Sequence, residues 1–318
     1  MNFIATGIGA GLVSALLAVV FLKETMSAAM LAMLAPLPIL IVALGWNHRS
    51  GLVATAVGTI AIGAFFSPLD GLGFALKTGL PSWFFAYLAL LGRPTSAGTM
   101  EWYPIGRILA WVAVIAAFAT MITVMISSDG DFGAYEGKVR QISEGLVTML
   151  FQPAQQGAED ARAALVETLA TIIPSISAFG FSFFLSLCLW LAAKVVAASG
   201  RLPRPWPPMP ELAMPRSVLL APVMAFVLTQ FEGFVGALGY ALFGAFLLAF
   251  TLQGLAAIHE RTRGKPGRGF ILAGLYLLLF LTQGIMIAAL SLFGLADTIF
   301  GSRRRIGDRP NPPSTLST

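Results

Sequence analysis

The chain has 318 residues, of which 57% are hydrophobic and 11% are charged, and its mean hydropathy is +0.82. An average soluble domain carries roughly 25% charged residues, so this chain has too little charge to cover a water-soluble globule. Its net charge is +5, but the Lys and Arg residues stand between apolar runs without interleaved aromatic residues, which argues against nucleic-acid binding. Composition therefore indicates an integral membrane protein in contact with the lipid bilayer.

Apolar stretches of about 20 residues recur along the chain, and each can cross a bilayer as a helix. The first lacks the basic segment of a cleavable signal peptide, so we expect it to be retained. The sequence thus predicts an all-α fold, a polytopic transmembrane helical bundle of about nine spans, with a range of about eight to ten. The predicted helices cover residues 3–22, 26–46, 51–67, 72–91, 104–127, 170–197, 216–231, 233–258 and 269–296.

Two of these helices are weaker candidates for a full crossing. The helix at 51–67 is short for a span, and the helix at 72–91 contains Lys77 and Pro81. Since each feature weakens a transmembrane assignment, one of the two could be re-entrant.

Three segments are predicted not to span. Residues 128–168 form a polar loop, within which an amphipathic helix is expected because apolar residues recur at spacings of three and four; these are Ile142, Leu146, Met149 and Leu150. Residues 200–216 contain many prolines and form an extended linker. Residues 301–318 form a basic, disordered tail. Residues 1–300 therefore constitute a single transmembrane domain that contains the loop and the linker.

The distribution of Lys and Arg predicts a cytoplasmic N-terminus. If nine helices alternate, one side collects Arg49, Arg93, Arg201, Arg204, Arg261, Arg263, Lys265 and Arg268. The same count places Arg303, Arg304 and Arg305 on the opposite side, which conflicts with the rule that cytoplasmic loops are basic. A break near Gln283-Gly284 would turn the last segment back and remove the conflict, although about 30 residues is short for two crossings.

Pro36 and Pro38 lie near the middle of the second predicted helix. Each proline lacks an N–H donor, so this helix must kink or break. Discontinuous helices often line substrate sites in transporters, which makes a binding pocket at Pro36 and Pro38 one interpretation. A kinked helix that only packs against its neighbours is the other.

Polar residues within apolar helices are a second group of candidate binding residues, because an intramembrane charge persists only for a reason. Gln253 lies deep in its predicted helix, and Asp297 ends the last helix before the arginine cluster. We expect these two to contribute to a substrate site. Lys77 could face a cavity or reach the headgroups, and Glu232 is interpreted as a cap of a tight helical hairpin.

Small residues form a stripe along the first predicted helix, where Gly7, Gly11 and Ala15 recur at intervals of four. Such a stripe lets another helix approach closely. The approaching helix can belong to this chain or to a membrane protein partner, and the sequence leaves both possibilities open.

Catalytic and cofactor motifs are missing from the sequence. It has no H-E-x-x-H, G-x-S-x-G or P-loop pattern, and its single cysteine, Cys188, cannot form an intramolecular disulfide. We therefore expect no enzyme activity, no cofactor and no metal site. A lipid-modifying enzyme that uses Asp129, Asp131 and Glu136 is the weakest of the alternatives.

Several short patterns together resemble a known family. They are Pro36-Leu37-Pro38 followed by Gly45-Trp46, the run at 252–259, and the run at 293–297 before the arginine cluster. Over most of residues 3–305 they resemble the YybS-like family of uncharacterised bacterial membrane proteins. That family is similar at a distance to the substrate-binding subunits of energy-coupling-factor vitamin transporters, whose first helix uses small residues to meet a partner subunit. The resemblance brings no catalytic residues and no particular substrate, because those subunits have fewer helices than this chain.

Two functions remain after these exclusions. The first is a bacterial inner-membrane protein that binds or transports a small molecule, as the resemblance implies. The alternative is a non-transporting membrane scaffold or biogenesis factor, in which the basic edges and the amphipathic loop are docking surfaces.

Overall fold

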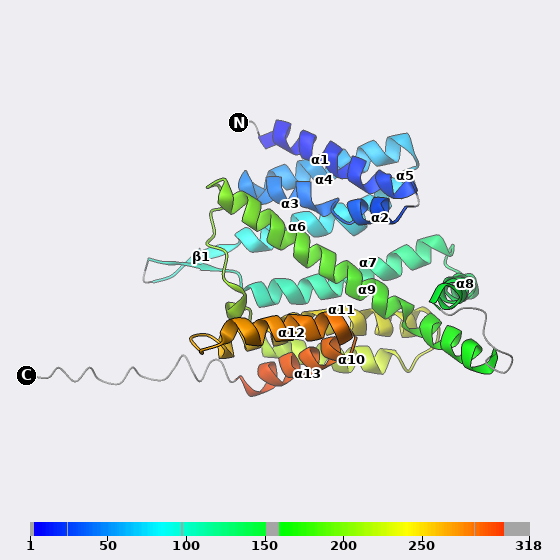
Figure 1. Ribbon diagram of the computed structural model, residues 1–318. Helices are drawn as coiled ribbons and strands as arrows, with labels where there is room; N and C mark the ends of the chain where they lie inside the picture. Colours follow the sequence, from blue (N-terminus) through cyan, green and yellow to red (C-terminus); the bar gives the residue numbers. More distant parts are fainter. Residues whose placement is uncertain (1–2, 24, 97, 151–158, 283, 302–318) are drawn as a thin grey trace, which may run out of the picture.

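The computed structural model describes residues 3–23, 25–96, 98–150, 159–282 and 284–301. These residues are almost entirely helical, as predicted, with one small β-hairpin among them (Figure 1). The α-helices are α1 (Phe3–Val19), α2 (Met26–Ala32), α3 (Pro36–Gly45), α4 (His48–Phe65), α5 (Pro68–Phe74), α6 (Leu80–Leu90), α7 (Ile105–Ser127), α8 (Phe132–Leu150), α9 (Glu159–Ala198), α10 (Leu220–Leu228), α11 (Gly233–Arg261), α12 (Arg268–Thr282) and α13 (Gly284–Phe300). Strands β1 (Gly92–Pro94) and β2 (Met100–Trp102) pair antiparallel.

Helices α1 to α6 form an upper layer and α10 to α13 a lower layer; α7 lies between them, and the long α9 crosses obliquely from the lower layer to the upper one (Figure 1). One apolar cluster joins α3, α6, α7 and α9, a second joins α7, α8, α9 and α11, and a third lies among α1, α3, α4 and α5. Alanine is frequent in all three clusters. In a bilayer the lipid tails are as apolar as the core, so helices associate mainly through close packing of small side chains.

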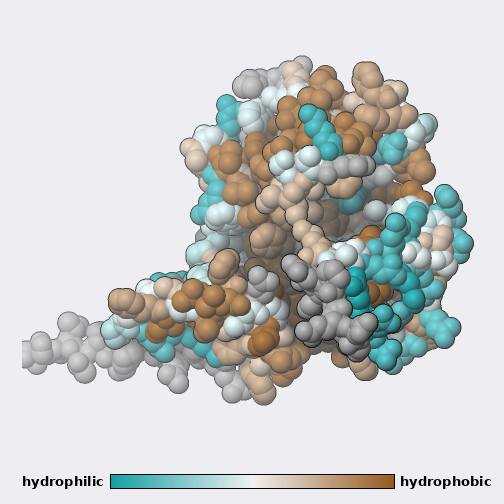
Figure 2. Space-filling view, turned by 45° about the vertical axis from the view of Figure 1, so that its right-hand side comes forward, coloured by the Kyte–Doolittle hydropathy of each residue, from teal (hydrophilic) through white to brown (hydrophobic). Residues whose placement is uncertain are grey.

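Five helical segments of the described residues are long and apolar enough to cross a membrane: Phe3–Lys23, Met26–Gly45, Ile105–Ser127, Glu159–Ala198 and Gly233–Arg261. Shorter apolar helices occupy Arg216–Leu228, Arg268–Thr282 and Gly284–Phe300. Hydrophobic side chains cover much of the upper layer on the side drawn in Figure 2. The chain is thus a helical protein with apolar spans, and the count of about nine stays a prediction.

The second predicted helix is broken, as its prolines require. Helix α2 ends at Ala32 and α3 begins at Pro36. The Ser14 hydroxyl of α1 donates a buried hydrogen bond of 2.6 Å to the Ala35 carbonyl at the break. The carbonyls that Pro36 and Pro38 leave free, those of Ala32 and Leu34, accept from the N–H groups of Ala35 and Leu37 at 3.0 and 2.9 Å.

The fourth predicted helix is continuous but distorted. Between α5 and α6 the chain forms a π-helical segment, η2 (Ala75–Gly79), just before Pro81. Proline cannot donate the helical hydrogen bond, and one wider turn accommodates it. The Thr55 hydroxyl of α4 donates to the Gly79 carbonyl at 3.0 Å and holds this wider turn in place.

The small-residue stripe of α1 packs against α4 of the same chain. A Cβ atom added to Gly11 would lie 2.4 Å from the Ala54 carbonyl oxygen, and one added to Gly7 would lie 2.8 Å from the Ser50 carbonyl oxygen. Ala15 is also buried. These positions are therefore filled by contacts within the chain.

Replacing Gly11 with leucine is expected to destabilise the protein by about 2 kcal/mol, because overpacking a tight contact forces the backbones apart. Gly9→Leu is the matched control, since a Cβ atom at Gly9 of the same helix meets nothing within 4 Å. Unfolding in a denaturing detergent measures the difference. Equal stabilities for the two variants would contradict the α1–α4 contact.

The proline-rich linker packs across one end of the bundle. Arg204 is 5% exposed, and its guanidinium donates to the carbonyl oxygens of Ala89 and Tyr103 at 3.1 and 2.9 Å. Arg201 lies over the Trp46 ring, 4.4 Å from its centre. Since a cation favours the C-terminal end of a helix, Arg204 stabilises the end of α6 while fixing the linker.

The last predicted helix, at 269–296, is wrong as a single helix, and the alternative of a break near Gln283-Gly284 agrees with the described residues. It is divided into α12 and α13, and α13 runs back alongside α12 in roughly the opposite direction (Figure 1). The dividing residue, Gln283, lies outside the described residues. Arg261 at the end of α11 lies 3.6 Å from Asp297 near the end of α13, so both helices end on the same side. Of the predicted tail at 301–318, only Gly301 belongs to the residues that the structure describes.

The amphipathic helix predicted within residues 128–168 is present as α8, and the side that packs on the bundle is not the predicted apolar stripe. The buried positions recur every four residues and are Tyr135, Val139, Ser143 and Val147. The predicted apolar positions are exposed at Ile142, Leu146 and Met149, and the side chain of Leu150 lies outside the description. Helix α8 therefore has one side packed on the bundle and an apolar outer side.

Candidate functional site

An open groove of about 1010 Å³ lies between α8, α9 and the start of α11. It lies at the end of the bundle opposite the chain termini, where α8 and the α10–α11 turn meet (Figure 1). The groove extends from Glu232 in the turn to Tyr240, about two helical turns along α11. Its volume suits a small-molecule ligand.

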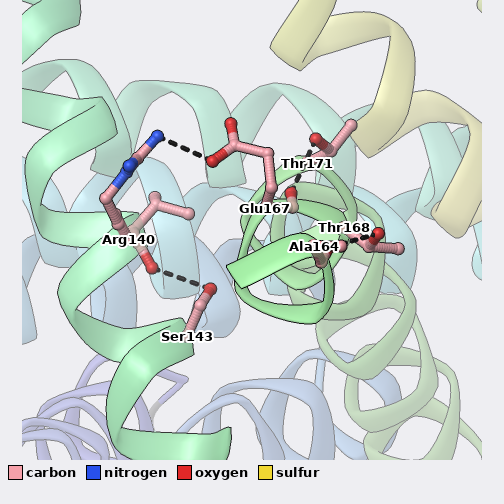
Figure 3. Close-up of polar contacts among 7 residues, drawn as sticks. Arg140, Ser143, Ala164, Glu167, Thr168 and Thr171 are labelled. Atoms are coloured by element: carbon pink, nitrogen blue, oxygen red, sulfur yellow. Dashed lines mark hydrogen bonds and ion pairs between the residues drawn. The ribbon is translucent and has the colours of Figure 1, made fainter. Parts of the chain in front are cut away.

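An ion pair spans the groove between α8 and α9. An Nη2 atom of Arg140 lies 2.6 Å from a carboxylate oxygen of Glu167, and Figure 3 shows the two side chains reaching toward each other. Both side chains are more than half exposed, so the pair contributes little to stability. The Glu167 carboxylate offsets the positive charge of Arg140 at the wall of the groove.

Two further carboxylates line the groove without an ion pair to any described residue, Glu136 of α8 and Glu232 of the α10–α11 turn. Glu232 occupies the N-cap position of α11, but its side chain forms no capping hydrogen bond. Glu232 therefore stands at the predicted cap position of the hairpin without capping the helix through its side chain. The side chain is exposed and available to a ligand.

Aromatic rings form the wall of the groove behind these carboxylates. Phe132 packs against Tyr135 and Phe234, with ring centres 5.6 and 5.1 Å apart. Tyr135 is 7% exposed, lines the groove, and its hydroxyl forms no hydrogen bond with the described residues. Burial, and to a smaller extent the charge of Glu136, raises the pKa of Tyr135 to about 12. The hydroxyl therefore stays protonated and can donate to a ligand.

Pro174 of α9 shapes the deep end of the groove. It has no N–H to donate to the carbonyl of Ala170, and both residues line the groove. Next to it, the Ser175 hydroxyl donates to the Tyr240 carbonyl at 2.6 Å. A Cβ atom at Gly244 would lie 2.0 Å from the backbone carbonyl oxygen of Ser175, so the backbones of α9 and α11 are in contact below the groove.

The structure brings Gln253 and Asp297, predicted separately, into direct contact. The Gln253 amide donates to a carboxylate oxygen of Asp297 at 2.8 Å and accepts from the Met214 N–H at 3.1 Å. Both side chains are at most 5% exposed, and Arg261 lies 3.6 Å from the other Asp297 oxygen. They line a small cavity of about 40 Å³, which has room for a water molecule but for no larger ligand. This cluster ties the linker to α11 and α13.

Pro36 and Pro38 lie away from both cavities. Pro36 is buried at the first turn of α3, and neither proline is among the residues that line the groove or the small cavity. The predicted helix break is present, and a binding pocket at the two prolines stays a prediction.

Sequence reasoning missed most of the groove. The sequence singles out Glu136 only together with Asp129 and Asp131, and no pattern singles out Tyr135 or Tyr240. Pro174 carried an available signal, because a proline inside a long apolar helix often marks a kink. No signal in the sequence predicts the pairing of α8 with α11, since about 100 residues separate the two helices.

Within the part of the chain that the structure describes, no three His, Cys, Asp or Glu side chains gather as metal ligands. Asp131 instead accepts a hydrogen bond from the Gly133 N–H at 2.9 Å at the start of α8. The position of the Asp131 carboxylate is therefore explained by a local backbone contact.

Comparison with known proteins places the chain among membrane proteins without assigning an activity. A family model described as "Predicted membrane protein (DUF2232)" matches residues 12–298. No curated protein and no solved structure matches the chain. Since the match extends from α1 to α13, the chain belongs to this family of predicted membrane proteins.

Proposed function

We propose that this protein is a bacterial inner-membrane protein that binds or transports a small molecule, and that the groove between α8, α9 and α11 is its binding site. The observation that carries the proposal is a groove that combines charged groups with an aromatic wall and an apolar depth next to Pro174. Ligand sites are typically concave, mostly apolar and provided with a few placed polar groups. Proline-distorted helices beside such a groove are common in transporters.

The proposed topology places the groove on the non-cytoplasmic side. Arg201, Arg204 and Arg261 lie at the opposite end of the bundle, which the positive-inside rule assigns to the cytoplasm. The turn between α12 and α13 returns the chain to that same end, as Gly301 beside Arg216 supports. Under this arrangement both termini are cytoplasmic, and the conflict over the C-terminal arginines disappears.

A groove-filling variant tests the proposed site. Thr171 lines the groove, so Thr171→Trp is expected to abolish ligand binding by occupying the space of the ligand. Thr168→Trp is the matched control: both hydroxyls bond to a carbonyl one turn earlier, but Thr168 does not line the groove (Figure 3). Native mass spectrometry of protein from its own membrane detects the bound molecule. The proposal fails if Thr171→Trp retains the same adduct as Thr168→Trp.

A scaffold remains the second candidate, and one observation favours it. Helix α12 has no buried residue within the described chain, and its exposed side chains include Phe270, Phe280 and Leu281. In a membrane this helix contacts either lipid or a second protein. Protein purified with a stoichiometric partner and without any small molecule would favour the scaffold.

A further inference from the structure

We infer that the groove binds an organic ammonium cation attached to an apolar body, an inference that rests on the proposed function and specifies its ligand.

The charge balance of the groove favours a cation. Its lining contains the carboxylates of Glu136, Glu167 and Glu232 against the single guanidinium of Arg140. Arg140 is already paired with Glu167, so Glu136 and Glu232 leave an uncompensated negative charge. They come from different elements, α8 and the α10–α11 turn, and both line the groove. An anionic ligand would be repelled.

The aromatic wall favours an ammonium group over a metal ion. Phe132 and Tyr135 line the groove and can present ring faces, which attract organic ammonium groups. Tyr135 adds an unpartnered hydroxyl on a side chain that is only 7% exposed. The oxygen of this hydroxyl can accept a hydrogen bond from an ammonium N–H.

The deeper part of the groove accommodates the apolar body. Beyond the carboxylates the lining includes the apolar side chains of Ala170, Pro174 and Ala237 and the ring of Tyr240, with Thr171 beside them. Two kinds of molecule combine an ammonium group, which would lie at the mouth, with an apolar body, which would lie in the deeper part. One is the amine headgroup of a membrane lipid, and the other is a free organic amine.

The inference is tested with benzyltrimethylammonium as the cationic probe and benzoate as the anionic one. The full-length protein is placed in phosphatidylglycerol nanodiscs, and binding is measured by isothermal titration. We expect saturable binding of benzyltrimethylammonium and none of benzoate. Glu136→Gln and Glu232→Gln are each expected to weaken binding by about tenfold, since each removes one close opposite charge. Glu144→Gln is the control, because Glu144 is an exposed carboxylate of α8 outside the groove.

Adding phosphatidylethanolamine to the nanodiscs separates the two sources. Competition with the probe identifies a lipid amine as occupant, and no competition identifies a free amine; both support a cation site. Benzoate binding that Thr171→Trp blocks would overturn the cation inference but leave the proposed function intact. If neither probe binds, the cation inference fails, while the proposed function is decided by the native adduct and its loss in Thr171→Trp. If binding of the cationic probe survives Thr171→Trp, the probe does not occupy the groove and the inference fails as well. Affinities for the cation that are equal in Glu136→Gln, Glu232→Gln and Glu144→Gln would also overturn the inference.

Discussion

Replacing Gln253 with leucine is expected to destabilise the protein by about 3 kcal/mol. The change removes the hydrogen bonds to Asp297 and to the Met214 N–H, all of which are buried. The Met214 N–H loses its buried partner, which costs about 1–3 kcal/mol, and Asp297 loses one contact while Arg261 stays near it. Because Met214 belongs to the linker, protease cleavage between residues 199 and 215 should accelerate as well. Detergent-induced unfolding and limited proteolysis measure the two effects.

A polar exchange provides the control for this prediction. Gln253→Glu alone places a second carboxylate beside Asp297, and we expect it to be as harmful as leucine. The double variant Gln253→Glu, Asp297→Asn restores one carboxylate and one amide in the same contact and should recover most of the lost stability. Failure of the double variant to recover would show that the pair does not act as a unit.

Replacing Gly244 with valine is expected to have the second large effect, a loss of about 3 kcal/mol together with loss of ligand binding. The valine Cβ atom would lie 2.0 Å from the Ser175 carbonyl oxygen, so α9 and α11 would have to separate. That contact lies directly below the groove, beside Pro174 and Tyr240. Detergent-induced unfolding and binding of the cationic probe measure the two losses.

Gly274→Val in α12 is the matched control. It carries the same intrinsic helix penalty, but a Cβ atom there meets nothing within 4 Å. If both valine variants lose equal stability, the effect arises from helix propensity, and the close contact between α9 and α11 is not needed.

Some parts of the candidate sites were accessible from the sequence. Gln253 and Asp297 stood out because polar groups in apolar helices need partners, and each proved to be the partner of the other. The prolines of the second helix correctly indicated a break. Neither pattern located the groove, because a cavity depends on which helices become neighbours.

The sequence by itself determined the class of protein, most helix positions, the broken second helix and the amphipathic α8. These follow from local rules: apolar length, missing proline N–H groups and three-to-four periodicity. Only the tertiary structure decided that the last helix turns back, that α1 uses its glycines on α4, and that Glu136 and Glu232 face one groove. Such pairings depend on surface fit between segments distant in the chain, and in a membrane apolar pattern alone cannot select them, since lipid satisfies an apolar face as well as another helix does.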